Sequence, residues 1–166
     1  MPVPTRKVKI GGVEIGGGAP VAIQSMCNTD TADVEATARQ ISALAEAGCA
    51  LVRVAVPDLT AARALKGLKA TARVPLIADV HFDHTLAVAA VENGADKVRV
   101  NPANLGTERD YIRVLHAAKA NGCAIRIGGN GGSKITDKAE RLQTVVDGCL
   151  RYARIAAQEG VTALVL

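Results

Sequence analysis

Aromatic residues are scarce in this sequence, which has no tryptophan, one phenylalanine and two tyrosines among 166 residues. Nucleic-acid binding that depends on stacking bases against aromatic side chains is therefore disfavoured. No apolar run approaches the length that a membrane-spanning helix needs, and no apolar segment follows the basic first residues. We therefore expect a cytoplasmic protein that acts on a small molecule, with neither nucleic acid nor membrane as a partner.

Cysteine pairs of the Cys-x-x-Cys type are also missing, although the chain has four cysteines: Cys27, Cys49, Cys123 and Cys149. Without such pairs or an export signal, the pattern predicts reduced thiols and no metal site. Lys and Arg outnumber Asp and Glu by 20 to 16, and the resulting charge of +4 suits an anionic small ligand.

A repeated unit runs along the chain, in which a glycine that ends a helix is followed at once by an apolar run. Such glycines stand at positions 48, 94, 122 and 160. Strands are predicted to begin near residues 21, 50, 75, 97, 124 and 161, at a mean spacing of 28 residues. Helix starts are predicted at Asp30 or Thr31, Asp58, Asp83, Thr107 with Asp110 as a capping box, and Thr136.

Alternating strands and helices predict an α/β fold with a parallel sheet. Eight such units would need about 224 residues, close to the roughly 250 of a (β/α)8 TIM-type barrel. The prediction is a barrel with about six of its strands present (residues 20–166), preceded by an arm and hairpin (1–19) with a Gly-Gly turn. Because the chain stops inside an apolar run, we expect a truncated chain. A doubly wound open sheet is the alternative, disfavoured because no G-x-G-x-x-G follows the first strand.

Three predicted strands carry an arginine between two β-branched residues, at Arg53, Arg99 and Arg126. Alternate residues of a strand face opposite ways, so if the β-branched residues face the helices, the arginines face the barrel interior. A buried guanidinium needs an anion, which could be an internal carboxylate such as Asp79 or Asp96. Interior acids are few, and a guanidinium binds phosphate oxygens in pairs, so a phosphorylated ligand is favoured.

Polar residues crowd the carboxyl ends of the predicted strands, where barrel enzymes place their sites. Asp79 and His81 alternate onto one face, as an orienting group and a proton-transfer group. Asn101 and Asn104 end the next strand, and a Gly-rich stretch surrounds Asn130. This stretch is either a backbone cradle for an anion or a flexible loop. Cys27 lies at the same rim.

The chain resembles the N-terminal barrel of the 4-hydroxy-3-methylbut-2-enyl diphosphate synthase family. The similarity runs in order along nearly the whole chain, through A-I-Q-S-M, L-I-A-D-V-H-F-D and R-V-N-P-A-N-L-G. The matching segments are residues 22–26, 28–31, 33–37, 52–58, 74–83, 99–106 and 125–128.

This resemblance implies reductive ring opening of 2-C-methyl-D-erythritol 2,4-cyclodiphosphate with electrons from flavodoxin or ferredoxin. It implies that the diphosphate binds in the barrel mouth at the residues that match the family's substrate-binding positions. These are Arg53, Asp79, His81, Arg99, Asn101, Asn104, Arg126 and Asn130. The family's redox centre is a 4Fe-4S cluster held by a separate C-terminal domain, and the bacterial enzymes are homodimers.

This sequence departs from the family pattern in ways that leave alternatives open. The residues expected for the last two strands and for the iron–sulfur domain are absent from it, so the chain alone is predicted to be inactive and to hold no cluster. Gly129 and Gly131–Gly132 around Asn130 also differ from the family. One alternative is a non-catalytic phosphate-binding module or degenerate paralogue, and another is a non-redox barrel enzyme with a different phosphorylated substrate.

Overall fold

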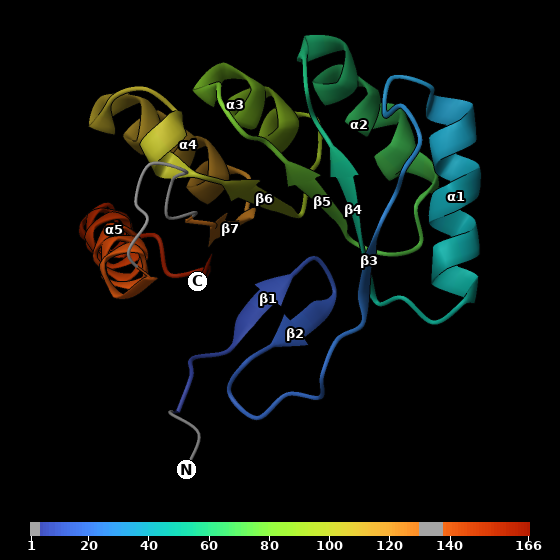
Figure 1. Ribbon diagram of the computed structural model, residues 1–166. Helices are drawn as coiled ribbons and strands as arrows, with labels where there is room; N and C mark the ends of the chain where they lie inside the picture. The colour runs from blue at the N-terminus through green and yellow to red at the C-terminus, as the bar shows by residue number, and fades with distance from the viewer. Residues whose placement is uncertain (1–3, 130–137) are drawn as a thin grey trace.

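A curved, six-stranded parallel sheet forms the centre of the computed structural model, which describes residues 4–129 and 138–166. The strands follow one another in chain order, from β3 at one edge to β8 at the other, and helices cover the outer face (Figure 1). The strands are β3 (Gln24–Met26), β4 (Leu51–Ala55), β5 (Leu76–Asp79), β6 (Lys97–Val100), β7 (Ala124–Ile127) and β8 (Leu164–Val165). The helices are α1 (Val34–Glu46), α2 (Leu59–Thr71), α3 (His84–Glu92), α4 (Glu108–Ala120) and α5 (Lys138–Gln158).

This arrangement is an arc of a (β/α) barrel, as the sequence predicted. A doubly wound sheet has helices on both faces and reverses its strand order, and neither feature is present in the described part of the chain. The α/β barrel prediction is therefore confirmed.

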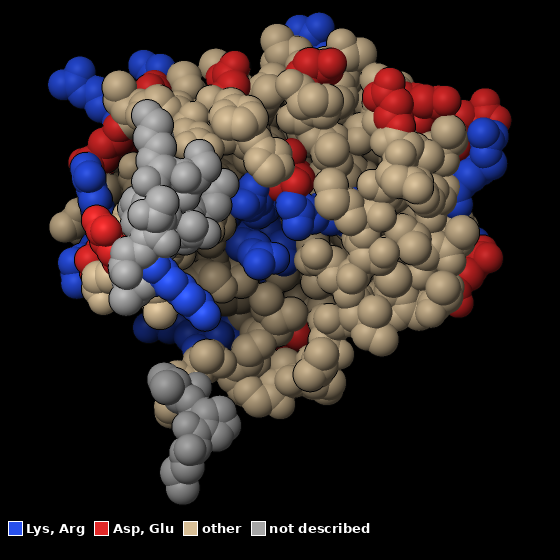
Figure 2. All heavy atoms as spheres, in the orientation of Figure 1, with Lys and Arg blue, Asp and Glu red and all other residues tan. Residues whose placement is uncertain are grey.

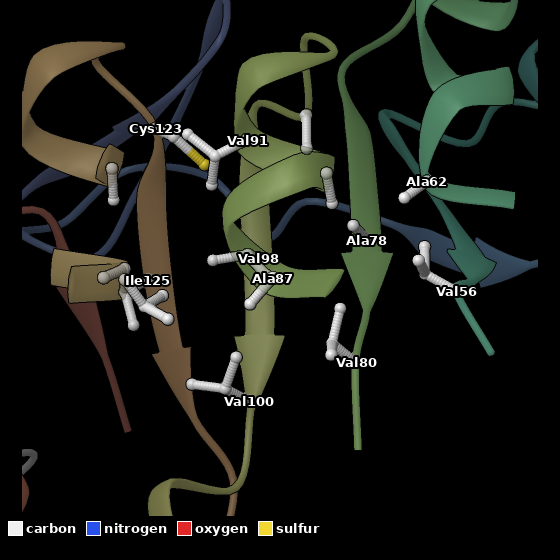
Figure 3. Close-up of a cluster of buried hydrophobic side chains, with 14 of the residues drawn as sticks. Val56, Ala62, Ala78, Val80, Ala87, Val91, Val98, Val100, Cys123 and Ile125 are labelled. Atoms are coloured by element: carbon white, nitrogen blue, oxygen red, sulfur yellow. The ribbon is translucent and has the colours of Figure 1, made fainter. Parts of the chain in front are cut away.

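The main hydrophobic core lies between the sheet and its helices. Alternate strand residues supply it, such as Val98 and Val100 from β6 and Ile125 from β7, and they meet Ala87 and Val91 of α3 (Figure 3). All five of these residues are at most 1% exposed. This packing fixes the direction of the strand residues between them, which point to the other face of the sheet.

The floor on that other face is a β-hairpin of β1 (Val8–Ile10) and β2 (Val13–Ile15). Gly11, at φ 54°, supplies the left-handed backbone that the predicted Gly-Gly turn requires. Val8 and Ile10 pack with Leu51, Ile77 and Ala124 from the first halves of three strands in a second, smaller cluster. The hairpin thus lies on the side of the sheet away from the helices (Figure 1).

Side-chain caps begin the helices mostly where the sequence predicted them. Asp58 and Asp83 cap α2 and α3, and Thr107 with Asp110 forms the capping box of α4. The first helix was predicted two or three residues too early, at Asp30 or Thr31, since its cap is Asp33, which accepts from the Ala36 N–H at 3.0 Å. Asp30 instead closes a local turn by accepting from the Ala32 N–H. Thr136 lies outside the described residues.

The two edge strands are shorter than the sequence predicted. The apolar run at 21–26 pairs from Gln24 onward and the run at 161–166 pairs at Leu164–Val165, because each has a neighbour on one side within the described chain. Val21 is consequently 95% exposed. None of the described helices combines the length and apolarity needed to cross a membrane.

Candidate anion-binding site

A cluster of charged side chains lies on the inner face of the sheet, around Asp79. The Asp79 carboxylate is 3% exposed. It pairs with Arg53 Nη2 through Oδ2 and lies 3.5 Å from Arg99 Nη1 through Oδ1. The register explains these pairs, since Asp79 lies opposite Ala55 on β4, two residues after Arg53, and opposite Arg99 on β6. One buried carboxylate therefore serves two guanidinium groups.

His81 extends this cluster towards the barrel mouth, where half of its side chain is exposed. Its Nε2 lies 3.2 Å from Asp79 Oδ2, and its Nδ1 lies 3.2 Å from Arg99 Nη1. A guanidinium can only donate, so Nδ1 accepts the hydrogen bond from Arg99, and Nε2–H donates a hydrogen bond to Asp79 Oδ2. These two contacts orient the imidazole between Asp79 and Arg99, and the role of His81 in proton transfer stays a prediction.

Two further cations on the same face have no such carboxylate. Arg126 lies opposite Arg99 in the register, and Lys97 precedes Arg99 by two residues. Within residues 4–129 and 138–166, neither side chain forms an ion pair with a carboxylate. Asp96, considered as a partner for the arginines, binds Lys69 and the Leu76 N–H instead. Figure 2 shows Lys and Arg side chains gathered in a hollow on this face.

The asparagines predicted for the site are arranged differently from one another. Asn101 directly follows β6, two residues after Arg99, and is 4% exposed. Asn104 is exposed at the end of the short 3-10 turn Pro102–Asn104. No side-chain hydrogen bond joins Asn104 to Asp79, His81 or the arginines. Asn130 lies outside the described residues.

The cysteines do not form a site in the described part of the chain. Cys27 stands at the predicted rim, but its side chain is buried in the helix–sheet core, where burial raises the pKa of the thiol. Burial likewise raises the pKa of Cys123 to about 12. Buried neutral thiols are poor nucleophiles and poor metal ligands. Among the described residues, no group of three or more His, Cys, Asp or Glu could hold a metal ion, so these residues do not fit an iron–sulfur cluster.

Comparison with known proteins places this arrangement in a family. A family model described as the GcpE TIM-barrel domain matches residues 5–166. The chain belongs to the GcpE TIM-barrel domain family.

Curated relatives of this GcpE barrel include proteins named 4-hydroxy-3-methylbut-2-en-1-yl diphosphate synthase (flavodoxin). The protein of that name from Caldanaerobacter subterraneus subsp. tengcongensis is 46% identical over 98% of this chain and 47% of its own length. The one from Lysinibacillus sphaericus is 54% identical over 78% of this chain and 35% of its own length. The chain therefore spans less than half the length of these relatives.

Solved structures with a similar fold include dihydropteroate synthase from Xanthomonas albilineans in complex with 7,8-dihydropteroate. The two chains superpose with a TM-score of 0.71 at 19% identity, over 98% of this chain and 63% of the other. Dihydropteroate synthase from Yersinia pestis gives the same TM-score at 12% identity, over 95% of this chain and 60% of that one. At these identities the likeness concerns the barrel fold alone.

Two residues of this candidate site were not singled out from the sequence, Lys97 and Gly128. Gly128 lies against the guanidinium of Arg99. A Cβ atom at position 128 would stand 2.8 Å from Arg99 Nη2 and 3.0 Å from Cζ, so a larger residue would require the Arg99 side chain to move. Period-two alternation could have indicated both, since each is two residues from an inward arginine on its own strand.

We therefore expect Gly128→Ala to move the Arg99 guanidinium away from His81 and Asp79. The affinity for inorganic pyrophosphate should fall about five- to ten-fold, or about 1 kcal/mol, because one charged donor is misplaced. Calorimetric titration measures the affinity, and the His81 ring resonances in NMR report the loss of the Arg99 contact. Gly148→Ala, on α5 where a Cβ meets nothing within 4 Å, is the control. Unchanged affinity and unchanged His81 resonances would show that Arg99 tolerates the methyl group in place.

Proposed function

We propose that this chain is the substrate-binding part of a 4-hydroxy-3-methylbut-2-enyl diphosphate synthase. In this proposal its inner face holds the diphosphate of 2-C-methyl-D-erythritol 2,4-cyclodiphosphate in a pathway to isoprenoids. Arg53, Arg99 and Arg126 bind phosphate oxygens, and Asp79 and His81 position the first two arginines. Asn101, Asn104 and Asn130 are the further substrate-binding residues.

The charge balance of the inner face is the observation that supports this proposal most strongly. Four cations, Arg53, Lys97, Arg99 and Arg126, share this face, and among the described residues the one carboxylate paired with any of them is Asp79, which contacts Arg53 and Arg99. Burying cations in excess is costly unless an anion joins them. A cyclic diphosphate carries one negative charge on each phosphorus, which suits this excess.

The paired geometry around Asp79 supports a positioning role for that residue. Asp79 and His81 hold the guanidinium of Arg99 from two sides, at 3.5 and 3.2 Å. A guanidinium fixed before the ligand arrives loses little freedom on binding, so more of the contact energy contributes to affinity. Its remaining donors can then form the paired hydrogen bonds that phosphate oxygens accept.

The redox part of the proposed reaction lies outside these residues. The relatives' printed name includes flavodoxin, and we propose a flavodoxin as the electron donor of the whole protein, acting in the cytoplasm through a 4Fe-4S cluster. When bound, that cluster would supply electrons for breaking a carbon–oxygen bond. The described residues bind and orient the diphosphate. A homodimer is proposed for the whole protein.

Titration of the chain with 2-C-methyl-D-erythritol 2,4-cyclodiphosphate tests this proposal. Arg99→Met should weaken binding at least about ten-fold, because a charge-assisted pair of hydrogen bonds is worth about 1.5–3 kcal/mol. Arg113→Met is the matched control, since Arg113 lies exposed on α4 with Asp110 as its partner at 3.4 Å. Equal dissociation constants for both variants would show that Arg99 is a structural ion-pair residue and does not bind the ligand.

The same titration separates the proposal from a degenerate module. A substrate-binding part should bind the cyclic diphosphate at least ten-fold more tightly than sulfate, because it was shaped for two linked phosphates. It should give no product with a strong reductant, because the described residues provide no cluster ligands. Binding of sulfate and cyclic diphosphate with equal affinity would favour a general phosphate-binding module, and product formation by the chain alone would contradict the proposed division of roles.

A further inference from the structure

Lys97 is the most unusual charged residue of the molecule outside the Asp79 cluster. Its side chain is 3% exposed, on the inner face of β6. In the register it lies opposite Ile77 on β5 and Ala124 on β7, which are both apolar and buried. Its ammonium has neither an ion pair nor a side-chain hydrogen bond with the residues that the structure describes. A buried ammonium in such surroundings is costly unless an anion joins it.

A second cation faces the same space. Lys97 and Arg126 both line a cavity of about 410 Å³ between the hairpin floor and the two edge strands. Gln24 of β3, Leu51 of β4 and Val165 of β8 line it as well, with Ile15 and residues 19–22 below. No aspartate or glutamate is among its lining residues in the described chain. The cavity therefore combines two positive charges, one amide and apolar walls.

The charges around Lys97 are arranged so that protein groups do not neutralise it. Burial, together with the nearby charges of Arg126 and Arg53, lowers the pKa of Lys97 to about 8. On its own strand Arg99 lies two residues away, and on β5 Asp79 is engaged by Arg53 and Arg99. The Asp79 carboxylate thus pairs with Arg53 and Arg99 and leaves Lys97 and Arg126 without a carboxylate among the described residues.

We propose that Lys97 and Arg126 form an anion subsite beside the Asp79 cluster, and that this subsite holds a phosphate group. The inference rests on the proposed function and adds Lys97 to its ligand-binding residues. Arg126 offers a planar set of donors and Lys97 a compact positive charge, which are the two side-chain types that bind phosphate oxygens. One phosphate of a diphosphate then lies against Arg53 and Arg99, and the other against Lys97 and Arg126.

Inorganic pyrophosphate, titrated calorimetrically into the chain at about pH 7, is the probe for this subsite. Lys97→Met should weaken pyrophosphate binding at least about ten-fold, since one charged contact is removed. The free variant should unfold at the same temperature as the wild type or a higher one, because methionine fills the space without a buried charge. Lys66→Met, on the exposed side of α2, is the matched control for the loss of one positive charge.

Proton uptake gives a second measurement that requires no variant. At about pH 8.5 part of the Lys97 population is neutral, so an anion that binds it restores the proton. Sulfate carries two charges throughout this range, and titration with sulfate in two buffers of different ionisation enthalpy should reveal that uptake. A purely structural lysine would not couple sulfate binding to a proton.

The outcomes separate this inference from the proposed function. If Arg99→Met loses affinity while Lys97→Met binds pyrophosphate within two-fold of the wild type and sulfate binds without proton uptake, the subsite is wrong and the proposed function stands. If the wild type binds neither pyrophosphate nor the cyclic diphosphate, both are wrong. Loss of affinity and of proton uptake in Lys97→Met alone, with Lys66→Met unchanged, supports the subsite.

Discussion

Asp79→Asn should destabilise the chain by about 3–5 kcal/mol, the cost of breaking a buried ion pair by removing one partner. The substitution keeps the shape of the side chain and removes the charge that both Arg53 and Arg99 contact. The inner face would then hold Arg53, Lys97, Arg99 and Arg126 without a carboxylate partner among the described residues. Urea unfolding followed by circular dichroism measures the effect, with phosphate-free buffer throughout.

Two further variants make this result specific. Asp147→Asn is the control, because Asp147 lies exposed on α5, where it accepts a hydrogen bond from Gln143 at 2.9 Å, and should change stability by less than about 0.5 kcal/mol. The double variant Arg53→Met with Asp79→Asn should be more stable than Asp79→Asn, because it removes one of the two orphaned guanidinium groups. A loss of less than about 1 kcal/mol in the free energy of unfolding for Asp79→Asn would mean that water already solvates the arginines in the folded chain.

Added pyrophosphate should recover part of the stability that Asp79→Asn loses. A ligand that binds the folded state raises the free energy of unfolding by RT ln(1 + [L]/Kd), about 2.7 kcal/mol at a hundred-fold excess over Kd. Arg53 Nε and Asp79 Oδ1 are buried without a hydrogen-bond partner in the described chain, so the cluster retains unused polar groups even with Asp79 in place. A bound anion could accept a hydrogen bond from Arg53 Nε.

Local signals in the sequence explain why most of the fold could be predicted. Asp58, Asp83 and Thr107 begin helices because each side chain accepts a hydrogen bond from an N–H of the first turn, a contact made within four residues. Period-two alternation placed Arg53, Arg99 and Arg126 opposite the valines and isoleucines of their own strands. Helix caps and period-two alternation depend only on residues close together in the sequence, so both can be recognised without knowing which distant segments are in contact.

Pairing between strands could not be predicted in the same way. The sequence allowed Asp79 or Asp96 as partners for the arginines, and the register decides that Asp79 meets Arg53 and Arg99 while Asp96 meets Lys69. A lysine at the start of a strand is usually exposed, so the residue type alone did not indicate that Lys97 would be only 3% exposed. The choice between Asp30 and Asp33 as the first cap likewise depended on a turn that the residue types alone did not determine.

Lys97 should make the stability of the free chain rise with pH between about 8 and 10.5. The unfolded side chain has its ordinary pKa of 10.5, and burial lowers the pKa to about 8 in the folded chain. Below pH 8 both states are protonated, and the cost of burying the charge is fully present. Between the two values the unfolded state binds more protons, so the free energy of unfolding rises with pH, by up to about 3 kcal/mol.

Comparison of the wild type with Lys97→Met isolates this rise from other titrations. Burial raises the pKa of Cys123 to about 12, so above pH 9 the unfolded thiol loses its proton first and stability falls in both proteins. Their difference removes that contribution: the variant should be the more stable protein at pH 7, and its advantage should shrink as the pH rises. Urea unfolding at pH 7, 8, 9 and 10 in phosphate-free buffer measures it, and Lys66→Met should show no such trend.

The same comparison with saturating pyrophosphate links the stability of Lys97 to its proposed role. A bound phosphate stabilises the charged ammonium and raises its folded pKa towards 10.5, so folded and unfolded states bind equal numbers of protons and the rise with pH disappears. The wild type then becomes more stable than Lys97→Met at pH 7, which reverses the order seen without ligand. A difference between the two proteins that stays flat with pH, with and without pyrophosphate, would show that burial of Lys97 carries no cost for a ligand to relieve.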